Sequence, residues 1–233
     1  MKKVIKLAVV SALTTFVQLS FGQAVFQTIE LAVSNPAAVV AAMDKFAASS
    51  TGRSVSNSVT LYRYVANGEN EATHLINIVH SSPDEMDANG TKLQGSQDVA
   101  AMGLEMIQAA RIVSTSVGQI LLSGGSAANI TNENPAVMLY FMSVSDPAAY
   151  AREFSSFLSQ NAGVGQTFLS SSLADGDNPT THIVFNRGNS LGELIKNQPQ
   201  SQDGWDAYSS RVAGLRTIEG TAMLRHVKTW ASQ

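Results

Sequence analysis

The chain contains two similar segments, and this internal repeat limits the possible fold more than any other feature of the sequence. Asn35-Pro36-Ala37-Ala38 recurs as Asp146-Pro147-Ala148-Ala149, at an offset of 147 − 36 = 111 residues. Thr73-His74-Leu75 recurs as Thr181-His182-Ile183, at an offset of 181 − 73 = 108 residues. Solenoid repeats have periods of roughly 20 to 50 residues, so this longer period indicates two copies of one small domain.

The hydrophobic pattern predicts the same order of elements in both copies. In the first copy, Thr28–Ser34 alternates as a strand does, and Asn35-Pro36 is typical of a helix start. Val59–Val65 and Thr73–Val79 are predicted strands, with the turn signal Asn67-Gly68 between them. A helix and a last strand complete each copy: helices Gln97–Ala110 and Gly204–Ala213, strands Arg111–Leu122 and Arg216–Trp230. Each copy is therefore predicted as β-α-β-β-α-β, a ferredoxin-like unit.

The repeat also sets the predicted domain boundaries. The first ferredoxin-like repeat spans residues 25–122 and the second spans residues 136–230. Residues 123–135 between them begin with a run of small residues, Ser123–Ala128, and are predicted to be a linker.

The N-terminus has the pattern of a secretory signal peptide. Met1-Lys2-Lys3 precedes the uncharged stretch Leu7–Phe21, and the small residues Ser20 and Gly22 follow the cleavage pattern. The stretch is shorter than the roughly 20 apolar residues that a membrane span requires. We therefore expect a bacterial Sec-type signal peptide over residues 1–22 and a periplasmic or secreted mature chain without a membrane span.

Composition excludes several classes of site. The chain has no cysteine, which rules out disulfides, thiolate metal ligands and thiol nucleophiles. Its net charge is −3, with 15 Lys and Arg residues scattered along the sequence. A nucleic-acid-binding protein gathers basic residues into a patch, so we expect no nucleic-acid partner.

The strand Thr73–Val79 carries apolar residues on both faces, so both faces of its sheet must be covered. Helices of the same repeat can cover one face, and the sheet of the other repeat can cover the second. The sequence thus predicts an α+β fold in which the antiparallel sheets of two tandem ferredoxin-like repeats pack into one barrel within the chain. Such a chain is expected to be a monomer or a weak homo-oligomer.

The element order, the paired Pro helix starts and the paired Thr-His strand openings resemble the dimeric α+β barrel superfamily over residues 26–230. This superfamily includes antibiotic-biosynthesis-type monooxygenases and the chlorite dismutase group. The resemblance implies a pocket in each half between the sheet and its helices. It does not transfer an activity, because function depends on the residues of the site.

His74 and His182 are the best-placed polar pair, since they occupy equivalent positions in the two repeats. Each is either a base or ligand-orienting donor, or a structural histidine that both copies inherited. The other candidate ligand-binding residues are aromatic or basic: Tyr62, Tyr140, Trp205, Tyr208 and Arg216.

Each of these further candidates has a structural alternative. Trp205 and Tyr208 are three residues apart on a predicted helix, so they share a face that core packing would also explain. Arg111 and Arg216 begin the last strand of each repeat, where an arginine either holds an anionic group or forms a surface ion pair.

We expect neither a cofactor nor a metal. The chlorite dismutase resemblance implies a heme held by a helical histidine in the second half, but Gly204–Ala213 contains none. His80 and Asp84 have the spacing of a metal pair, but Pro83 lies between them. The Gly-x-Ser-x-Gly motif of serine hydrolases is absent as well.

Two functions stay open at this point. One is an exported, non-catalytic barrel that binds a small apolar or aromatic molecule or a protein partner, because the sequence shows no assembled catalytic group. The alternative is a cofactor-independent monooxygenase-like enzyme acting on aromatic or polyphenolic substrates, which the fold resemblance implies. The sequence identifies no catalytic residue for either function.

Overall fold

The computed structural model describes residues 24–161 and 165–231, and the predicted signal peptide lies outside them. The described strands form one closed antiparallel barrel in the order β1-β3-β2-β8-β5-β7-β6-β4. In the first half (residues 24–125) the elements are β1 Val25–Val33, α1 Pro36–Ala48, α2 Ser50–Ser54, β2 Ser58–Ala66, β3 His74–His80, α3 Pro83–Leu93, α4 Gln97–Ala109 and β4 Ala110–Gly125.

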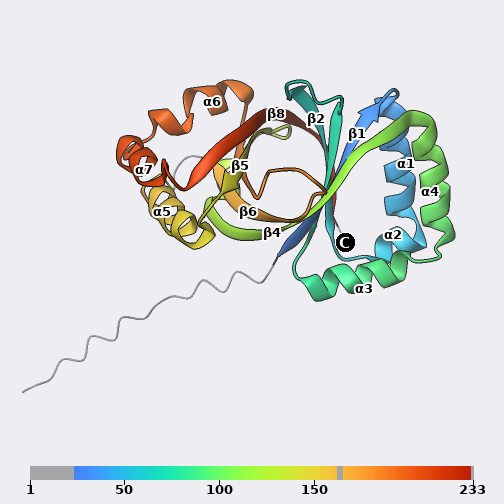
Figure 1. Ribbon diagram of the computed structural model, residues 1–233. Helices are drawn as coiled ribbons and strands as arrows, with labels where there is room; N and C mark the ends of the chain where they lie inside the picture. The colour runs from blue at the N-terminus through green and yellow to red at the C-terminus, as the bar shows by residue number, and fades with distance from the viewer. Residues whose placement is uncertain (1–23, 162–164, 232–233) are drawn as a thin grey trace, which may run out of the picture.

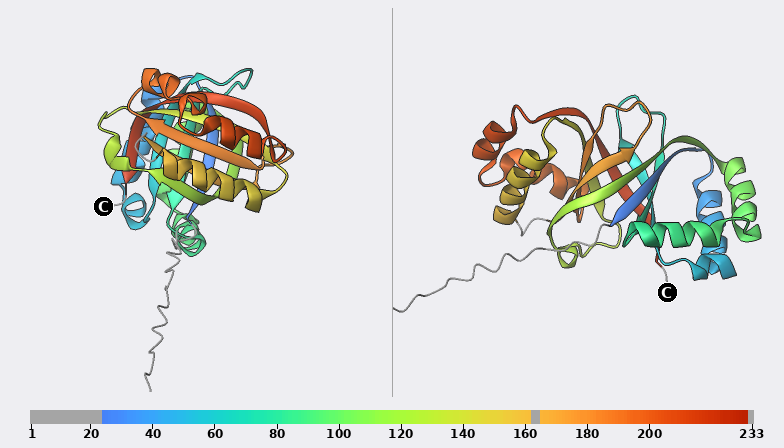
Figure 2. Two further views of the ribbon diagram at one scale, coloured as in Figure 1. Left: turned by 90° about the vertical axis from the view of Figure 1, so that its left-hand side faces the viewer. Right: turned by 60° about the horizontal axis from the view of Figure 1, so that its bottom comes forward.

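A short 3-10 helix, η1 (Ala127–Asn129), follows β4 and leads to the second half (residues 136–231). Its elements are β5 Ala136–Val144, α5 Pro147–Gln160, β6 Gln166–Ala174, β7 His182–Gly188, α6 Leu191–Lys196, the 3-10 helix η2 Pro199–Ser201, α7 Trp205–Val212 and β8 Arg216–Ala231. The helices of the two halves cover opposite sides of the barrel (Figures 1 and 2).

The two longest strands close the barrel. Strand β4 pairs with β1 of its own half and with β6 of the other half. Strand β8 pairs in the same way with β5 and β2. Each of these strands is 16 residues long, which lets it bridge both sheets. The α+β barrel within one chain is therefore confirmed, and each half orders its strands as last, first, third, second.

The predicted helix starts are confirmed in both halves. The Asn35 side-chain oxygen accepts a hydrogen bond from the Ala38 N–H at 3.2 Å, and Asp146 accepts one from Ala149 at 2.9 Å. A proline follows each cap at the first helical position, where a missing N–H costs no hydrogen bond.

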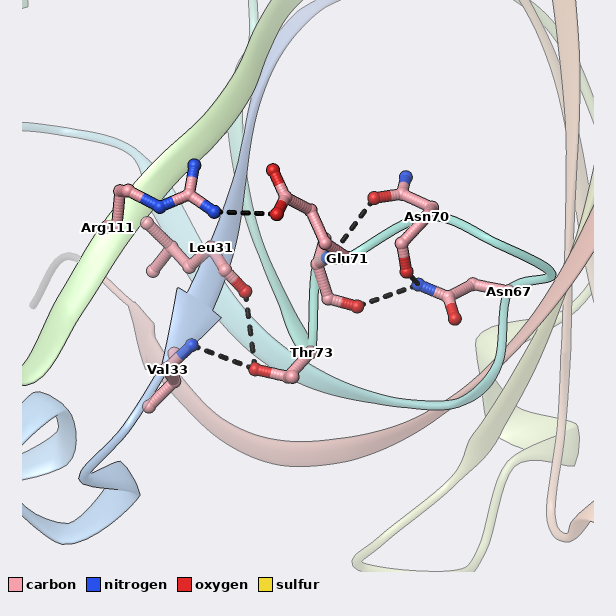
Figure 3. A network of polar contacts seen from close by, with 8 residues as sticks. Leu31, Val33, Asn67, Asn70, Glu71, Thr73 and Arg111 are labelled. Carbon is pink, nitrogen blue, oxygen red and sulfur yellow. Dashed lines mark hydrogen bonds and ion pairs between the residues drawn. The ribbon is translucent and has the colours of Figure 1, made fainter.

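The Asn67-Gly68 turn is longer than the two-residue hairpin turn that the sequence predicts. Strand β2 ends at Ala66 and β3 begins at His74, so a loop connects them. The Asn67 side chain donates to the Asn70 and Ala72 carbonyls, at 3.1 and 2.7 Å, and closes this loop (Figure 3). Only Gly68 in this loop has a left-handed φ, of 64°.

Strand β4 extends three residues into the predicted linker, 123–135. Ser123, Gly124 and Gly125 continue the pairing with β6. A Cβ atom on Gly124 would lie 3.0 Å from the Leu158 side chain of α5. The small residue at this position therefore permits the close approach of α5 to the sheet, where the sequence alone suggested a flexible connection.

Both faces of the sheets are covered, as the apolar pattern of β3 requires. In the first half, aliphatic side chains fill the layer between the helices and the sheet; they include Leu31, Val39, Leu61 and Ile76. A second cluster, which includes Val137 and Leu224, lies inside the barrel. Within the described residues, no helix combines the length and apolar character that crossing a membrane would demand.

Candidate functional site

A pocket of about 170 Å³ lies between helices α5 and α7 and the outer face of the second-half sheet. Six aromatic side chains line this aromatic pocket: Tyr140, Tyr150, Phe154, Phe157, Trp205 and Tyr208. Its remaining lining combines five apolar residues, five amide side chains, Thr167 and a single charged group, Arg216. The pocket is thus predominantly apolar with a few polar groups, as small-molecule sites usually are.

The sequence of α5 aligns three of these rings. Tyr150, Phe154 and Phe157 follow at intervals of four and three residues, so they share one face of the helix. The Tyr150 and Phe154 rings stack with their centroids 5.8 Å apart. The Phe157 ring stacks on Tyr208 of α7 at 4.6 Å, and its face meets the edge of Trp205 at 6.0 Å. The aromatic contacts between the two helices therefore fix one wall of the pocket.

Two phenol groups form a buried hydrogen-bond chain in this wall. The Tyr208 hydroxyl donates to the Tyr150 hydroxyl at 3.1 Å, and the Tyr150 hydroxyl donates to the Met142 sulfur at 3.3 Å. Burial raises the pKa of Tyr150 and of Tyr208. Both phenols are accordingly neutral near pH 7, so they act as hydrogen-bond donors and not as bases.

Arg216 places a positive charge beside these phenols. Its guanidinium carbon lies 6.0 Å from the centroids of both the Tyr150 and the Tyr208 rings, within cation–π range. The Nε atom of Arg216 is buried and has no hydrogen-bond partner among the described residues. A buried donor without a partner is costly unless a bound group completes it.

Amide side chains complete the polar part of the pocket. The Thr167 hydroxyl donates to the Asn186 side-chain oxygen at 3.2 Å and orients that amide. The Asn161 side chain donates to the carbonyls of Phe157 and Asp203, at 3.0 and 3.2 Å. These bonds tie the end of α5 to the loop that precedes α7.

The structure brings four of the seven predicted site residues into this pocket: Tyr140, Trp205, Tyr208 and Arg216. Tyr208 is also part of the hydrophobic core, so the core and site interpretations both apply to it. Tyr62 lies elsewhere, on the inner face of the barrel. His74 and His182 are buried at the starts of β3 and β7 and are not among the described residues that line the pocket.

The two histidines each contact the threonine that precedes them. The ring nitrogen Nδ1 of His74 lies 2.9 Å from the Thr73 hydroxyl, and that of His182 lies 2.9 Å from the Thr181 hydroxyl. Burial lowers the pKa of both rings. His182 also meets the edge of the Tyr150 ring, at a centroid distance of 6.5 Å. The shared threonine contact agrees with a structural role, but the Nε2 atom of His182 is buried without a hydrogen-bond partner among the described residues, which sets His182 apart from His74.

Tyr150, Phe154 and Phe157 are site residues that the sequence analysis missed. The sequence contained a signal for two of them. Tyr150 and Phe154 correspond, 111 positions earlier, to the smaller Val39 and Met43 of α1. Larger aromatic residues on the buried face of one helix indicate which half differs in the packing of its helix layer.

Arg111, the counterpart of Arg216, has a different environment. It forms an ion pair with Glu71 at 2.8 Å, and about 60% of its side chain is exposed (Figure 3). The surface ion pair, one of the two interpretations from the sequence, therefore applies to Arg111 but not to Arg216.

The residues of the pocket do not fit a heme group. The chlorite dismutase resemblance implies a histidine on a second-half helix, whereas the described helices α5, α6 and α7 contain none. Groups of three or more His, Asp or Glu residues that could bind a metal ion are also not found in residues 24–161 and 165–231.

No protein-family model and no curated protein matches the sequence. Solved structures match the fold. A monooxygenase-like protein from Fusobacterium nucleatum has a TM-score of 0.60 at 11% identity, over 91% of this chain and 95% of that chain. An anthrone oxidase-like protein has a TM-score of 0.57 at 14% identity, over 91% and 94%. A chlorite dismutase variant from Candidatus Nitrospira defluvii has a TM-score of 0.52 at 7% identity, over 88% and 91%.

These similarities confirm the predicted resemblance of the fold to the dimeric α+β barrel superfamily. At such low identity they concern the fold alone, and the side chains of this chain must carry any argument about function.

Proposed function

We propose that this protein binds a small aromatic molecule carrying a phenolic oxygen in the aromatic pocket of its second half. The observation that carries the proposal is the buried Arg216 Nε without a partner, next to a cavity that six aromatic side chains line. A ring in this cavity would meet aromatic side chains, and its oxygen would accept the hydrogen bond that Arg216 offers.

The size of the pocket suits a ligand with one ring. Its volume is about 170 Å³. An apolar cavity of about 150 Å³, engineered into another protein, binds benzene. A phenol therefore fits, whereas a fused three-ring molecule would have to extend beyond the pocket.

Tryptophan fluorescence provides a direct test because the chain has two tryptophans and only Trp205 lines the pocket. Trp230 of β8 packs against the helix layer of the first half, away from this pocket, and its indole N–H donates to Asp44 of α1 at 2.7 Å. In a Trp230→Phe variant, titration with 4-methylphenol should change the remaining fluorescence saturably at millimolar or lower concentration. In a Trp205→Phe variant, the same titration should change nothing beyond inner-filter absorption. A response that is equal in the two variants would refute the proposed site.

A second candidate function is a cofactor-independent oxygenase. Arg216 favours it, because a guanidinium beside the ligand oxygen stabilises the phenolate or enolate form that reacts with O₂. The fold match to monooxygenase-like and anthrone oxidase-like proteins is consistent with this chemistry. The reaction would convert an activated methylene and O₂ into a ketone and water, R₂CH₂ + O₂ → R₂C=O + H₂O.

Oxygen uptake separates the two candidates. An enzyme should consume O₂ in the presence of anthrone, which has an activated methylene and whose outer rings would extend beyond the pocket, faster than buffer does, and Arg216→Met should lower that rate. Binding of 4-methylphenol with no uptake above buffer would retain the binding function and eliminate the oxygenase.

We also propose that the chain is exported and that its two halves arose by duplication of one ferredoxin-like unit. Residues 1–22 support export through their Lys-Lys start and apolar stretch. The same strand order and the same helix caps in both halves support duplication. Intact mass measurement of the protein isolated from its native host should show loss of the leader, and retention of Met1 would contradict export.

A further inference from the structure

A second cavity, of about 680 Å³, lies inside the barrel and is separate from the aromatic pocket. Its volume is in the range of sites for drug-sized ligands, about 300 to 1,000 Å³. It holds a single basic residue among its described lining, Arg187 of β7. The Nε atom of Arg187 is buried and has no hydrogen-bond partner in the described part of the chain.

The acidic residues of this barrel cavity do not pair with Arg187. Glu30 already accepts hydrogen bonds from the Tyr64 hydroxyl at 2.5 Å, from the Ser114 hydroxyl at 2.8 Å and from the Asn70 amide at 3.1 Å. Burial and the charge of nearby Glu30 both raise the pKa of Asp175, so these two carboxyl groups lie close together. The third acidic residue of the lining, Glu219, lies on β8 five residues before Leu224, the position that strand pairing through Val137 sets level with Arg187.

Strand register places Arg187 at the opposite end of the barrel from Asp175. Arg187 pairs with Gln166, the first residue of β6, and Asp175 follows the last residue of that strand. At about 3.3 Å per residue, the nine steps from Gln166 to Asp175 span roughly 30 Å along the strand. The cavity thus has a basic end and an acidic end.

Aromatic side chains lie next to the basic end. The ring edges of Tyr62 and Phe168 both meet Phe185, two residues before Arg187, at centroid distances of 6.0 and 6.1 Å. Burial raises the pKa of Tyr62, and its hydroxyl is therefore a neutral donor. His226 adds no charge here, because burial and the nearby Arg187 lower its pKa.

We propose that the barrel cavity binds an aromatic monocarboxylate. Its carboxylate pairs with the Arg187 guanidinium, and its rings lie against Tyr62, Phe168 and Phe185. A guanidinium presents two parallel donors that match a planar carboxylate. The acidic end repels a second carboxylate, so the site selects monoanions over dianions.

Isothermal titration of the full chain with three matched probes tests this site. We expect 2-naphthoate to bind at least about tenfold more tightly than 2-naphthylmethanol, which has no charge to pair with Arg187, and more tightly than naphthalene-2,6-dicarboxylate, whose second carboxylate faces the acidic end. Equal affinity for the acid and the alcohol would overturn the proposal without any variant.

Substitution then locates the site. Arg187→Met should weaken 2-naphthoate binding by about 10- to 100-fold, the usual range for loss of a charge-assisted hydrogen bond. Arg225→Met is the matched control, because Arg225 is exposed on β8 and should leave the affinity unchanged. If Arg216→Met abolished 2-naphthoate binding and Arg187→Met left it unchanged, the ligand would bind in the aromatic pocket, and the proposal would be overturned.

Stability separates a binding residue from a structural one. Because the buried Arg187 Nε atom has no hydrogen-bond partner in the described residues, Arg187→Met should leave the melting temperature unchanged or raise it. A lower melting temperature together with unchanged 2-naphthoate affinity would show that Arg187 serves the fold alone and would contradict the site.

Discussion

The helix layers of the two halves share one backbone pattern but differ in what fills them. Val39 and Met43 of α1 face the first-half sheet, and Tyr150 and Phe154 take the equivalent places on α5. The first layer packs aliphatic side chains together, whereas the second combines stacked rings with a cavity. Planar rings are rigid and fill irregular space less well than branched aliphatic chains do. A binding pocket can therefore arise by changing side-chain shape on an unchanged helix.

The facing helices differ in length. Helix α4 has 13 residues, and α7 has only eight. The chain before α7 forms a loop instead, which adds Asn197, Gln200 and Gln202 to the pocket wall. The second half thus has polar groups that can orient a ligand where the first half has a longer helix.

Truncation of the Tyr150 ring should lower the free energy of unfolding more than any other change considered. Tyr150 is 1% exposed and contacts Phe154, Met142 and Tyr208, so Tyr150→Ala should cost about 3–5 kcal/mol of unfolding free energy. Val39→Ala in the first half removes fewer atoms and should cost about 2 kcal/mol. Urea unfolding of both variants measures the difference. Equal costs would show that the aromatic layer contributes no more than the aliphatic one.

The two equivalent arginines should separate binding from surface charge. Arg216→Met should weaken 4-methylphenol binding by about tenfold or more, because it removes the charged donor and the cation–π contact. Arg111→Met is the matched control, and it should change neither the affinity nor the melting temperature noticeably, since its ion pair is exposed. A comparable loss of affinity in both variants would mean that long-range charge, not the pocket, controls binding.

The buried histidines should make both halves equally sensitive to acid. Burial lowers the folded-state pKa of His74 and His182 below the usual 6.5, so between these values the unfolded chain binds protons that the folded chain does not. Stability should consequently fall as the pH drops from 7.5 to 5.5. His74→Gln and His182→Gln should each flatten this slope to a similar extent in denaturant titrations. A flattening by only one of them would show that the two environments differ in function.

Loss of a helix cap should lower the free energy of unfolding least, and by a similar amount in the two halves. Asn35→Ala and Asp146→Ala each remove one hydrogen bond to a helix N–H and should each cost about 1 kcal/mol. Thermal unfolding of the two variants provides the measurement, with Ser56→Ala as a variant outside these caps. A much larger cost for Asp146→Ala would indicate that the start of α5 also supports the aromatic pocket.

Sequence reasoning predicted the fold better than the site. The repeated Pro helix starts and the two-sided apolar pattern of β3 lie within short segments, so local chemistry was sufficient to predict the elements and the barrel. It placed Tyr140, Trp205, Tyr208 and Arg216 on the candidate list, and these four share one pocket. It did not single out Tyr150 or Arg187, because the role of each side chain depends on the residues that surround it in the folded chain.

The amino-acid sequence by itself determined where α1 and α5 begin, the order of the strands along the chain and the need to cover both faces of the sheets, but it did not predict α2, α3 or α6. These properties follow from periodicity, caps and composition along a few consecutive residues. Only the tertiary structure decided that Arg111 meets Glu71 at the surface while Arg216 and Arg187 have buried Nε atoms with no partner among the described residues. Equivalent residues differ in this way because desolvation and pairing depend on contacts between strands and helices far apart in the chain.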